Sequence, residues 1–183
     1  MFSENLIINK KEISYQGTFD DKNIVDVFVD EFKSLGYNII KKEKNVSGSK
    51  IEQELVFIKE MRIKSWMDKF EEWLFNTKRG RFIELKIRTF VDEDSKKKII
   101  DVLGKKIKVR EGKINITSNG FVVDKRDIEF AYSGVRMMIG VAFQNLVNMG
   151  NRFSAENELR SNVNKVYKVI NAELQLNKYK FKS

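Results

Sequence analysis

The residues of this chain that could do chemistry are lysines, arginines, carboxylates and aromatic rings, because histidine and cysteine are both absent. Histidine is the side chain whose ordinary pKa lies near neutrality, and most general acid–base mechanisms depend on it. Without either residue there is no Cys/His zinc site, no thiolate nucleophile and no Ser-His-Asp triad. We therefore expect a non-enzymatic protein, with no catalytic residue, no metal site and no cofactor.

Basic residues form the largest group of candidates, and the formal net charge is +9. They gather around a turn near residue 45, within residues 96–110, and in the C-terminal tail, where they alternate with Tyr179 and Phe181. Basic side chains interleaved with aromatic rings can hold RNA by charge and by stacking. The candidate contacts with an anionic partner are Lys96, Lys97, Lys98, Lys105, Lys106, Lys108, Lys178, Lys180 and Lys182.

Lysine supplies 26 of the 35 basic residues. A lysine ammonium is a hydrated point charge, whereas arginine offers the planar fork that reads bases and clasps phosphates. A lysine-rich composition is also typical of an ordinary solvated surface, and we favour that interpretation for the loops. Any binding to nucleic acid should accordingly be weak, independent of base sequence and sensitive to salt.

Two further groups of side chains have both a functional and a structural interpretation. Trp66, Phe70 and Trp73 recur at helical spacing, so they could dock a partner or cover one face of a sheet, and we favour the core. Residues 92–94 are three consecutive acids that could attract a divalent cation. They lack the spacing of a calcium loop, so we interpret them as a surface turn.

The elements that must position these side chains follow from hydrophobic periodicity. Residues 6–19 predict a strand, after which Asp20 and Asp21 stand where a helix N-cap belongs. Apolar residues at helical spacing continue towards Gly36, which has the position of a glycine that ends a helix. Two strands joined by a turn are then predicted between residues 37 and 60.

The middle of the chain predicts an amphipathic helix at 62–78 and a strand at 81–91, in which apolar and charged residues alternate. Four short runs separated by glycines follow at 99–103, 105–110, 113–117 and 121–124. Asn119-Gly120 is a strong hairpin signal, because both residues accept a positive φ. The four runs therefore predict a β-meander.

The C-terminal part predicts two helices, one from Asp127 and a second that starts near Ser154, after a break at Gly150-Asn151. Residues 177–183 should form a basic tail that frays. We expect the whole chain, 1–183, to be one α+β domain. Its mostly antiparallel sheet would carry an N-terminal helix, a middle amphipathic helix and C-terminal helices on one face.

The sequence also bears on where the protein works. We see no signal peptide and no stretch apolar enough for a transmembrane helix. A chain without cysteine cannot form disulfides, which fits a reducing compartment. We therefore expect a cytoplasmic protein.

The order of elements resembles that of a group of small uncharacterised proteins from small-genome archaea. The resemblance rests on the segments at 17–20, 35–37, 104–109, 112–116 and 120–124. That group has no known activity, so the resemblance implies no catalytic residue. More loosely, the order is similar to helix-grip domains, in which a long C-terminal helix lies across a curved sheet and can leave an apolar cavity.

Two functions lead in the interpretation of the sequence, ahead of a third class, an enzyme that uses carboxylates or lysines. The first is a non-enzymatic interaction module or assembly subunit, whose partner is a protein or an anionic molecule such as RNA. The second is a helix-grip pocket for a hydrophobic small molecule, beneath the helix predicted at 127–149. We favour a filled core over a pocket, because packed interiors leave few voids. The residues expected to fill that space are Leu85, Ile87, Ile114 and Ile116.

Overall fold

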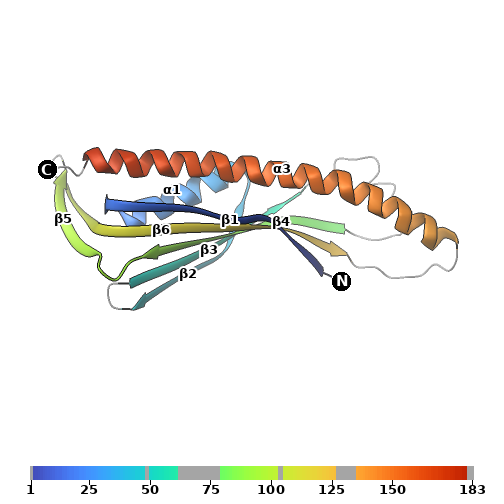
Figure 1. Cartoon of the computed structure of the whole chain (residues 1–183), viewed down its shortest axis with the longest axis horizontal. Coiled ribbons are helices and arrows are strands. Elements are labelled where there is room, and N and C mark those ends of the chain that lie inside the picture. Colours follow the sequence, from blue (N-terminus) through green and yellow to red (C-terminus); the bar gives the residue numbers. More distant parts are fainter. Residues whose placement is uncertain (1, 48–49, 62–78, 103–104, 127–134, 181–183) are drawn as a thin grey trace.

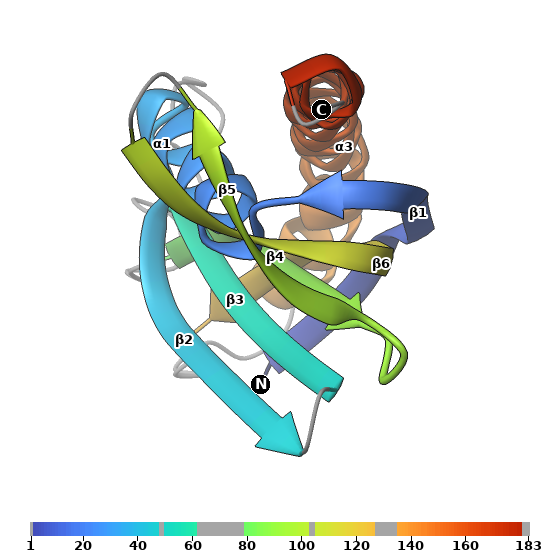
Figure 2. The same cartoon turned by 90° about the vertical axis from the view of Figure 1, so that its left-hand side faces the viewer.

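The computed structural model describes residues 2–47, 50–61, 79–102, 105–126 and 135–180. In chain order, its elements are β1 (Phe2–Phe19), α1 (Asp21–Ser34), β2 (Asn38–Ser47), β3 (Lys50–Glu60), β4 (Arg79–Val91), β5 (Lys96–Val102), β6 (Lys105–Arg126) and α3 (Val135–Lys180). The strands form one antiparallel sheet in the order β1-β6-β4-β3-β2, with β5 paired to β6. Both helices lie on the same side of the sheet, and α3 runs along its length (Figures 1 and 2). The predicted α+β class and antiparallel sheet are confirmed.

Helix α1 is capped at both ends. The Asp20 side chain accepts hydrogen bonds from two backbone N–H groups of the first turn. At the other end, Tyr37 donates its backbone N–H to the carbonyl of Phe32 at 3.0 Å, and Gly36 donates to Lys33 at 2.9 Å. This Schellman motif needs the positive φ of 83° that Gly36 adopts. Helix α1 lies between β1 and β2 in the chain.

The core lies between the sheet and the two helices. Helix α1 contributes Phe28 and Phe32, which are both fully buried. The sheet contributes the alternating apolar residues of its inner face, which include Leu55 and Phe57 as well as the four residues expected to fill the interior. Helix α3 contributes the predicted apolar stripe of Leu159, Val163, Val166, Tyr167, Ile170 and Leu174. This half of α3 therefore packs against the sheet, whereas the filled core expected beneath residues 127–149 concerns side chains outside the described ones.

The pairing of β5 with the first part of β6 confirms the first hairpin of the predicted β-meander. Strand β6 then runs without interruption for 22 residues, so the rest of the meander and its hairpin at Asn119-Gly120 are wrong. β4 and β5 pair with successive parts of β6 and together form one long strand that is interrupted at residues 92–95. These four residues stand opposite only Gly112 and Lys113, so they form a bulge. Ser95 packs so closely there that a Cβ on Gly112 would lie 2.8 Å from the Ser95 Cα. Bulges bend a strand pair and increase its twist.

Helix α3 is a single helix of 46 residues, so the predicted break at Gly150-Asn151 and the second start near Ser154 are wrong. A glycine inside a helix costs about 1 kcal/mol, and the chain has no proline that would end the helix sterically. Because α3 continues to Lys180, residues 177–180 are helical and not a frayed tail. Asn177 is even 2% exposed.

Two of the predicted features lie outside the described residues. The amphipathic helix expected at 62–78, with Trp66, Phe70 and Trp73, is one of them. The other is the very end of the tail, residues 181–183. Neither helix in the described ranges combines the length and the apolar character that a membrane crossing requires.

Candidate nucleic-acid interface

The lysine-rich segment 96–111 forms a two-stranded arm at one end of the sheet. We call β5 together with residues 105–111 of β6 the β5–β6 arm. Within the described ranges β5 pairs only with β6, and the pairing of β1 with β6 reaches no further along the arm than Arg110. The arm therefore projects beyond the sheet as two strands. It curves towards α1, at the end of the molecule where α3 also ends (Figures 1 and 2).

Five lysines of the arm have exposed side chains, namely Lys96, Lys97, Lys98, Lys106 and Lys108. Residues directly opposite each other share a face of a strand pair. Lys97 and Lys108 accordingly lie on the face of Arg110, whereas Lys96 and Lys98 lie on the face of Glu111. Positive charge therefore extends on both faces of the arm.

Acidic residues compensate only part of this charge. Segment 96–111 contains seven basic residues and two acidic ones, so it carries more than half of the net charge of the chain. Lys98 forms an ion pair with Glu111, and its hydrogen bond lowers the pKa of the Glu111 carboxyl. The remaining lysines of the arm outnumber the one other acid, Asp101, so the arm keeps a net positive charge.

Arg110 connects the arm to helix α1. Its side chain is 8% exposed, and its Nε lies 3.7 Å from Oδ1 of Asp21. The other carboxylate oxygen of Asp21 lies 3.5 Å from Nζ of Lys44 on β2. Because β4 and β3 separate β6 from β2 in the sheet, the sheet must curve around the first turn of α1 for both cations to reach one carboxylate. The contact between Arg110 and Asp21 lies at the base of the arm, where the pairing of β1 with β6 ends.

The C-terminal lysines lie at the same end of the molecule as the arm. Asn23 of α1 donates its side-chain amide to Oε1 of Glu173 at 3.1 Å, which places the first turn of α1 beside the last turns of α3. Because α3 continues to Lys180, Lys178 and Lys180 belong to those last turns, and Lys105 pairs with Val102 near the tip of the arm. Lys182 lies outside the described residues.

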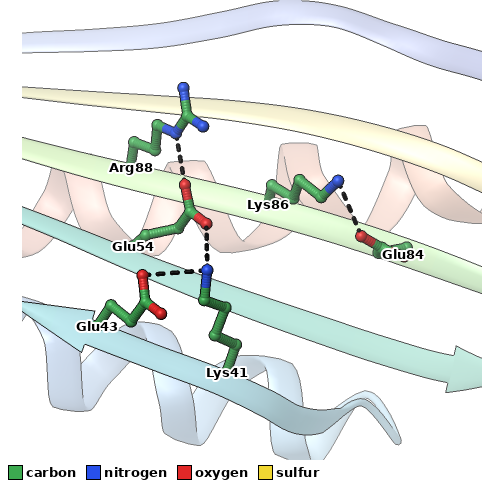
Figure 3. A network of polar contacts seen from close by, with 6 residues as sticks. All are labelled: Lys41, Glu43, Glu54, Glu84, Lys86 and Arg88. Carbon is green, nitrogen blue, oxygen red and sulfur yellow. Dashed lines mark hydrogen bonds and ion pairs between the residues drawn. The ribbon is translucent and has the colours of Figure 1, made fainter.

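Two of the three lysines of β2, Lys41 and Lys44, differ from most of those of the arm because each lies beside an acid. Lys41 Nζ lies 3.0 Å from Glu43 Oε2 and 3.5 Å from Glu54 Oε1, and Nε of Arg88 lies 2.6 Å from Glu54 Oε2. Figure 3 shows this network on the outer face, which is the face of the sheet opposite the helices. The hydrogen bond from Arg88 lowers the pKa of the Glu54 carboxyl, and the one to Glu43 raises the pKa of Lys41.

The outer face also has a hollow that the sequence analysis missed. It has a volume of about 640 Å³, and three strands supply its lining of Lys10, Glu12, Arg88, Phe90, Asn115, Thr117, Asn119 and Phe121. The signal for it was present in the sequence. Ile114 and Ile116 alternate with Asn115, Thr117 and Asn119, as on a strand with one apolar and one polar face. Because Asn119-Gly120 was interpreted as a hairpin turn, the alternating segment was divided there into two strands.

No protein-family model and no curated protein matches this chain. The resemblance to the archaeal group and to helix-grip domains therefore stays a prediction.

The acids of the 92–94 segment belong to the bulge between β4 and β5, where the Asp92 carboxylate accepts a hydrogen bond from the Glu93 N–H at 2.8 Å. The candidate interface therefore consists of the β5–β6 arm and the outer face of the sheet.

Proposed function

We propose that this protein is a non-enzymatic interaction module, or a subunit of a larger assembly, whose β5–β6 arm contacts an anionic partner such as RNA. The observation that carries the proposal is the set of five exposed lysines on a projecting two-stranded arm with few acids to neutralise them. Lysine neutralises phosphate without reading bases, so binding through the arm is independent of base sequence and falls steeply with salt.

The rest of the charge on the molecule supports the same assignment. Lys41 of β2 is engaged with Glu43 and Glu54, and Lys44 with Asp21. Lys59 is engaged with Glu158, so these three cations contact the rest of the fold. The arm is where positive charge exceeds its nearby partners. We place the protein in the cytoplasm as part of the same proposal, because a chain without cysteine suits a reducing compartment that contains RNA.

The helix-grip alternative has less support from the described side chains. A pocket for a hydrophobic molecule needs space between α3 and the sheet, and residues 155–174 of α3 fill that space with the apolar stripe. The side chains of the earlier part of α3, where the pocket was expected, lie outside the described ones. We therefore keep the arm as the leading proposal.

The test is a titration of fluorescently labelled single-stranded RNA with the full chain, followed by anisotropy at several salt concentrations. The arm variant K96Q/K97Q/K98Q removes three exposed charges. Its matched control, K33Q/K165Q/K168Q, removes three exposed charges from the two helices. We expect the wild type to bind at low salt, and each arm lysine that contacts a phosphate to contribute about 1 to the slope of log K against log salt.

The arm variant should therefore bind more weakly than the control and show a shallower salt dependence. Equal losses in the two variants would show that only net charge matters and would contradict a role for the arm. Absence of binding by the wild type at low salt would reject RNA as the partner.

A further inference from the structure

The hollow on the outer face is built along the central strand of the sheet. Asn115, Thr117 and Asn119 form its floor, because alternate residues of β6 point to the same face. Phe90 pairs with Asn115 at one end of the floor, and Phe121 lies on β6 at the other end. The seven residues from Asn115 to Phe121 make six steps along the strand, about 20 Å, so the hollow has room for a short extended ligand.

The floor offers hydrogen bonds that the fold does not use. The structure records no hydrogen bond from the side chains of Asn115, Thr117 or Asn119 to another described residue, although each is only partly exposed. A side-chain amide offers two donors and one acceptor, and a hydroxyl offers both functions. The floor can therefore pair with the edges of an unstacked base.

The walls of the hollow combine aromatic rings with cations. Phe90 and Phe121 are half-buried, and the Lys86 ammonium lies 4.8 Å from the ring centroid of Phe121. Lys10 and Arg88 stand on opposite sides of the floor, on β1 and β4. Two acids are engaged with these cations, since Glu54 bonds Arg88 at 2.6 Å and Glu12 lies 3.1 Å from Lys10. The hollow therefore has ring surfaces with modest net charge, which suits bases better than a run of phosphates.

The hollow is continuous with the β5–β6 arm. Both lie on β6, which carries the arm at 105–111 and the floor at 115–119. Lys113 is exposed between them, and by alternation it lies on the same face as Asn115. A strand of nucleic acid that follows β6 meets the lysines of the arm first, then Lys113 beside the exposed acids of the bulge at 92–94, and then rings and amides.

We propose that the hollow binds two or three unpaired bases of single-stranded RNA whose phosphates contact the arm. The inference rests on the proposed function and adds to it a preference for unpaired bases. Sheets that present aromatic rings beside polar side chains stack two or three bases in this manner, and stacking tolerates every base. A duplex hides its base faces and cannot enter the hollow.

The test compares three probes with the full chain: labelled single-stranded oligoadenylate, an RNA duplex of the same length, and heparin as a polyanion without bases. The wild type should bind the single strand about tenfold more tightly than the duplex, the order of magnitude that one stacked base supplies. The variant F90L/F121L keeps apolar volume but removes both rings. It should lose that preference and bind heparin as the wild type does.

A matched control, S14A/N45A, removes one hydroxyl and one amide from the outer positions of β1 and β2, outside the lining of the hollow. It should bind all three probes as the wild type does. If F90L/F121L does not fold, N115A/N119A removes floor hydrogen bonds at sites without a recorded structural partner and should weaken single-strand binding alone. Equal wild-type affinity for single strand and duplex, or an unchanged preference in the folded hollow variant, would overturn the inference. The proposed function would survive that result if the arm variant still lost heparin and RNA binding.

Discussion

Leu159 of α3 lies directly against Gly120 of β6. A Cβ built on residue 120 would stand 2.7 Å from the Leu159 Cδ2 atom, which is closer than side chains normally approach. Leu159 is fully buried, so it has little freedom to move aside. The glycine at 120 therefore serves the contact between helix and sheet and does not mark a turn.

Gly120→Ala should lower the free energy of unfolding by about 1–3 kcal/mol, which is the usual cost of overpacking a core. Urea denaturation would measure it. The matched background is Leu159→Ala, which costs about 2–5 kcal/mol by itself but removes the atoms that clash. In that background the alanine at 120 should cost less than about 0.5 kcal/mol. An undiminished cost would show that the strain lies elsewhere.

Phe32→Ala should cost about 3–5 kcal/mol, because it empties a fully buried aromatic site. The Phe32 ring centroid lies 4.9 Å from that of Phe57 and 5.4 Å from that of Tyr37, so both neighbours lose packing. The control is Phe153→Ala on α3, where the ring is 68% exposed and the change should stay within about 0.5 kcal/mol. A loss below about 1 kcal/mol for the Phe32 variant in denaturant titration would contradict the packing of α1.

The elements that the sequence predicted well are those whose signals are local. Asp20 caps α1 and Gly36 ends it, as their chemistry requires wherever a helix begins and ends. The alternation in β4 also predicted which of its residues face the core, since Ile83, Leu85 and Ile87 are all fully buried. In each case the deciding residues are neighbours in the chain.

The features that the sequence did not reveal depend on distant partners. Asn119-Gly120 has the local preference of a hairpin. The glycine at 120 is instead required by close packing against Leu159, about 40 residues away in the chain. The hollow takes Lys10 from β1 and Arg88 from β4, so no single segment contains its pattern. The lysine clusters were visible in the sequence, but which lysines lack acidic partners follows only from the sheet register.

Lys59 is a partly buried link between three elements. Its Nζ donates to the Leu35 carbonyl at the end of α1 and to Oε1 of Glu158 on α3, both at 2.7 Å. Lys59→Met should cost about 1–3 kcal/mol, because it leaves a partly buried carbonyl and carboxylate without their charged donor. The control, Lys33→Met, replaces an exposed lysine and should change stability by less than about 0.5 kcal/mol.

A double-mutant cycle separates this ion pair from packing. Glu158→Gln should destabilise the wild type but should have little effect once Lys59 is methionine, since the interaction is then already absent. If the two changes are additive, Lys59 stabilises the fold through its aliphatic chain over the Tyr37 ring or through Leu35, and not through Glu158.

Two buried tyrosines should make the fold sensitive to alkaline pH. Burial raises the pKa of Tyr37 and that of Tyr167 to about 12. In the unfolded chain both hydroxyls titrate near their ordinary value of about 10. Because the folded pKa is the higher one, each tyrosine contributes its full stabilisation below about pH 10 and loses it as the pH rises towards 12. The loss at the top of that range is about 2–3 kcal/mol for each tyrosine.

The variants Y37F and Y167F remove these titrations one at a time. Each should flatten the decline of unfolding free energy between pH 10 and 12, measured by urea denaturation at a series of pH values. At neutral pH each variant loses one modest hydrogen bond, because Asn162 donates to the Tyr37 hydroxyl at 3.3 Å and the Tyr167 hydroxyl donates to the Lys11 carbonyl at 3.2 Å. The double variant should therefore be somewhat less stable than the wild type near pH 7. It should become the more stable of the two as the pH approaches 12, because the loss per tyrosine exceeds the contribution of one hydrogen bond, about 1 kcal/mol. A decline that stays equally steep in the double variant would contradict the assignment of the alkaline sensitivity to Tyr37 and Tyr167.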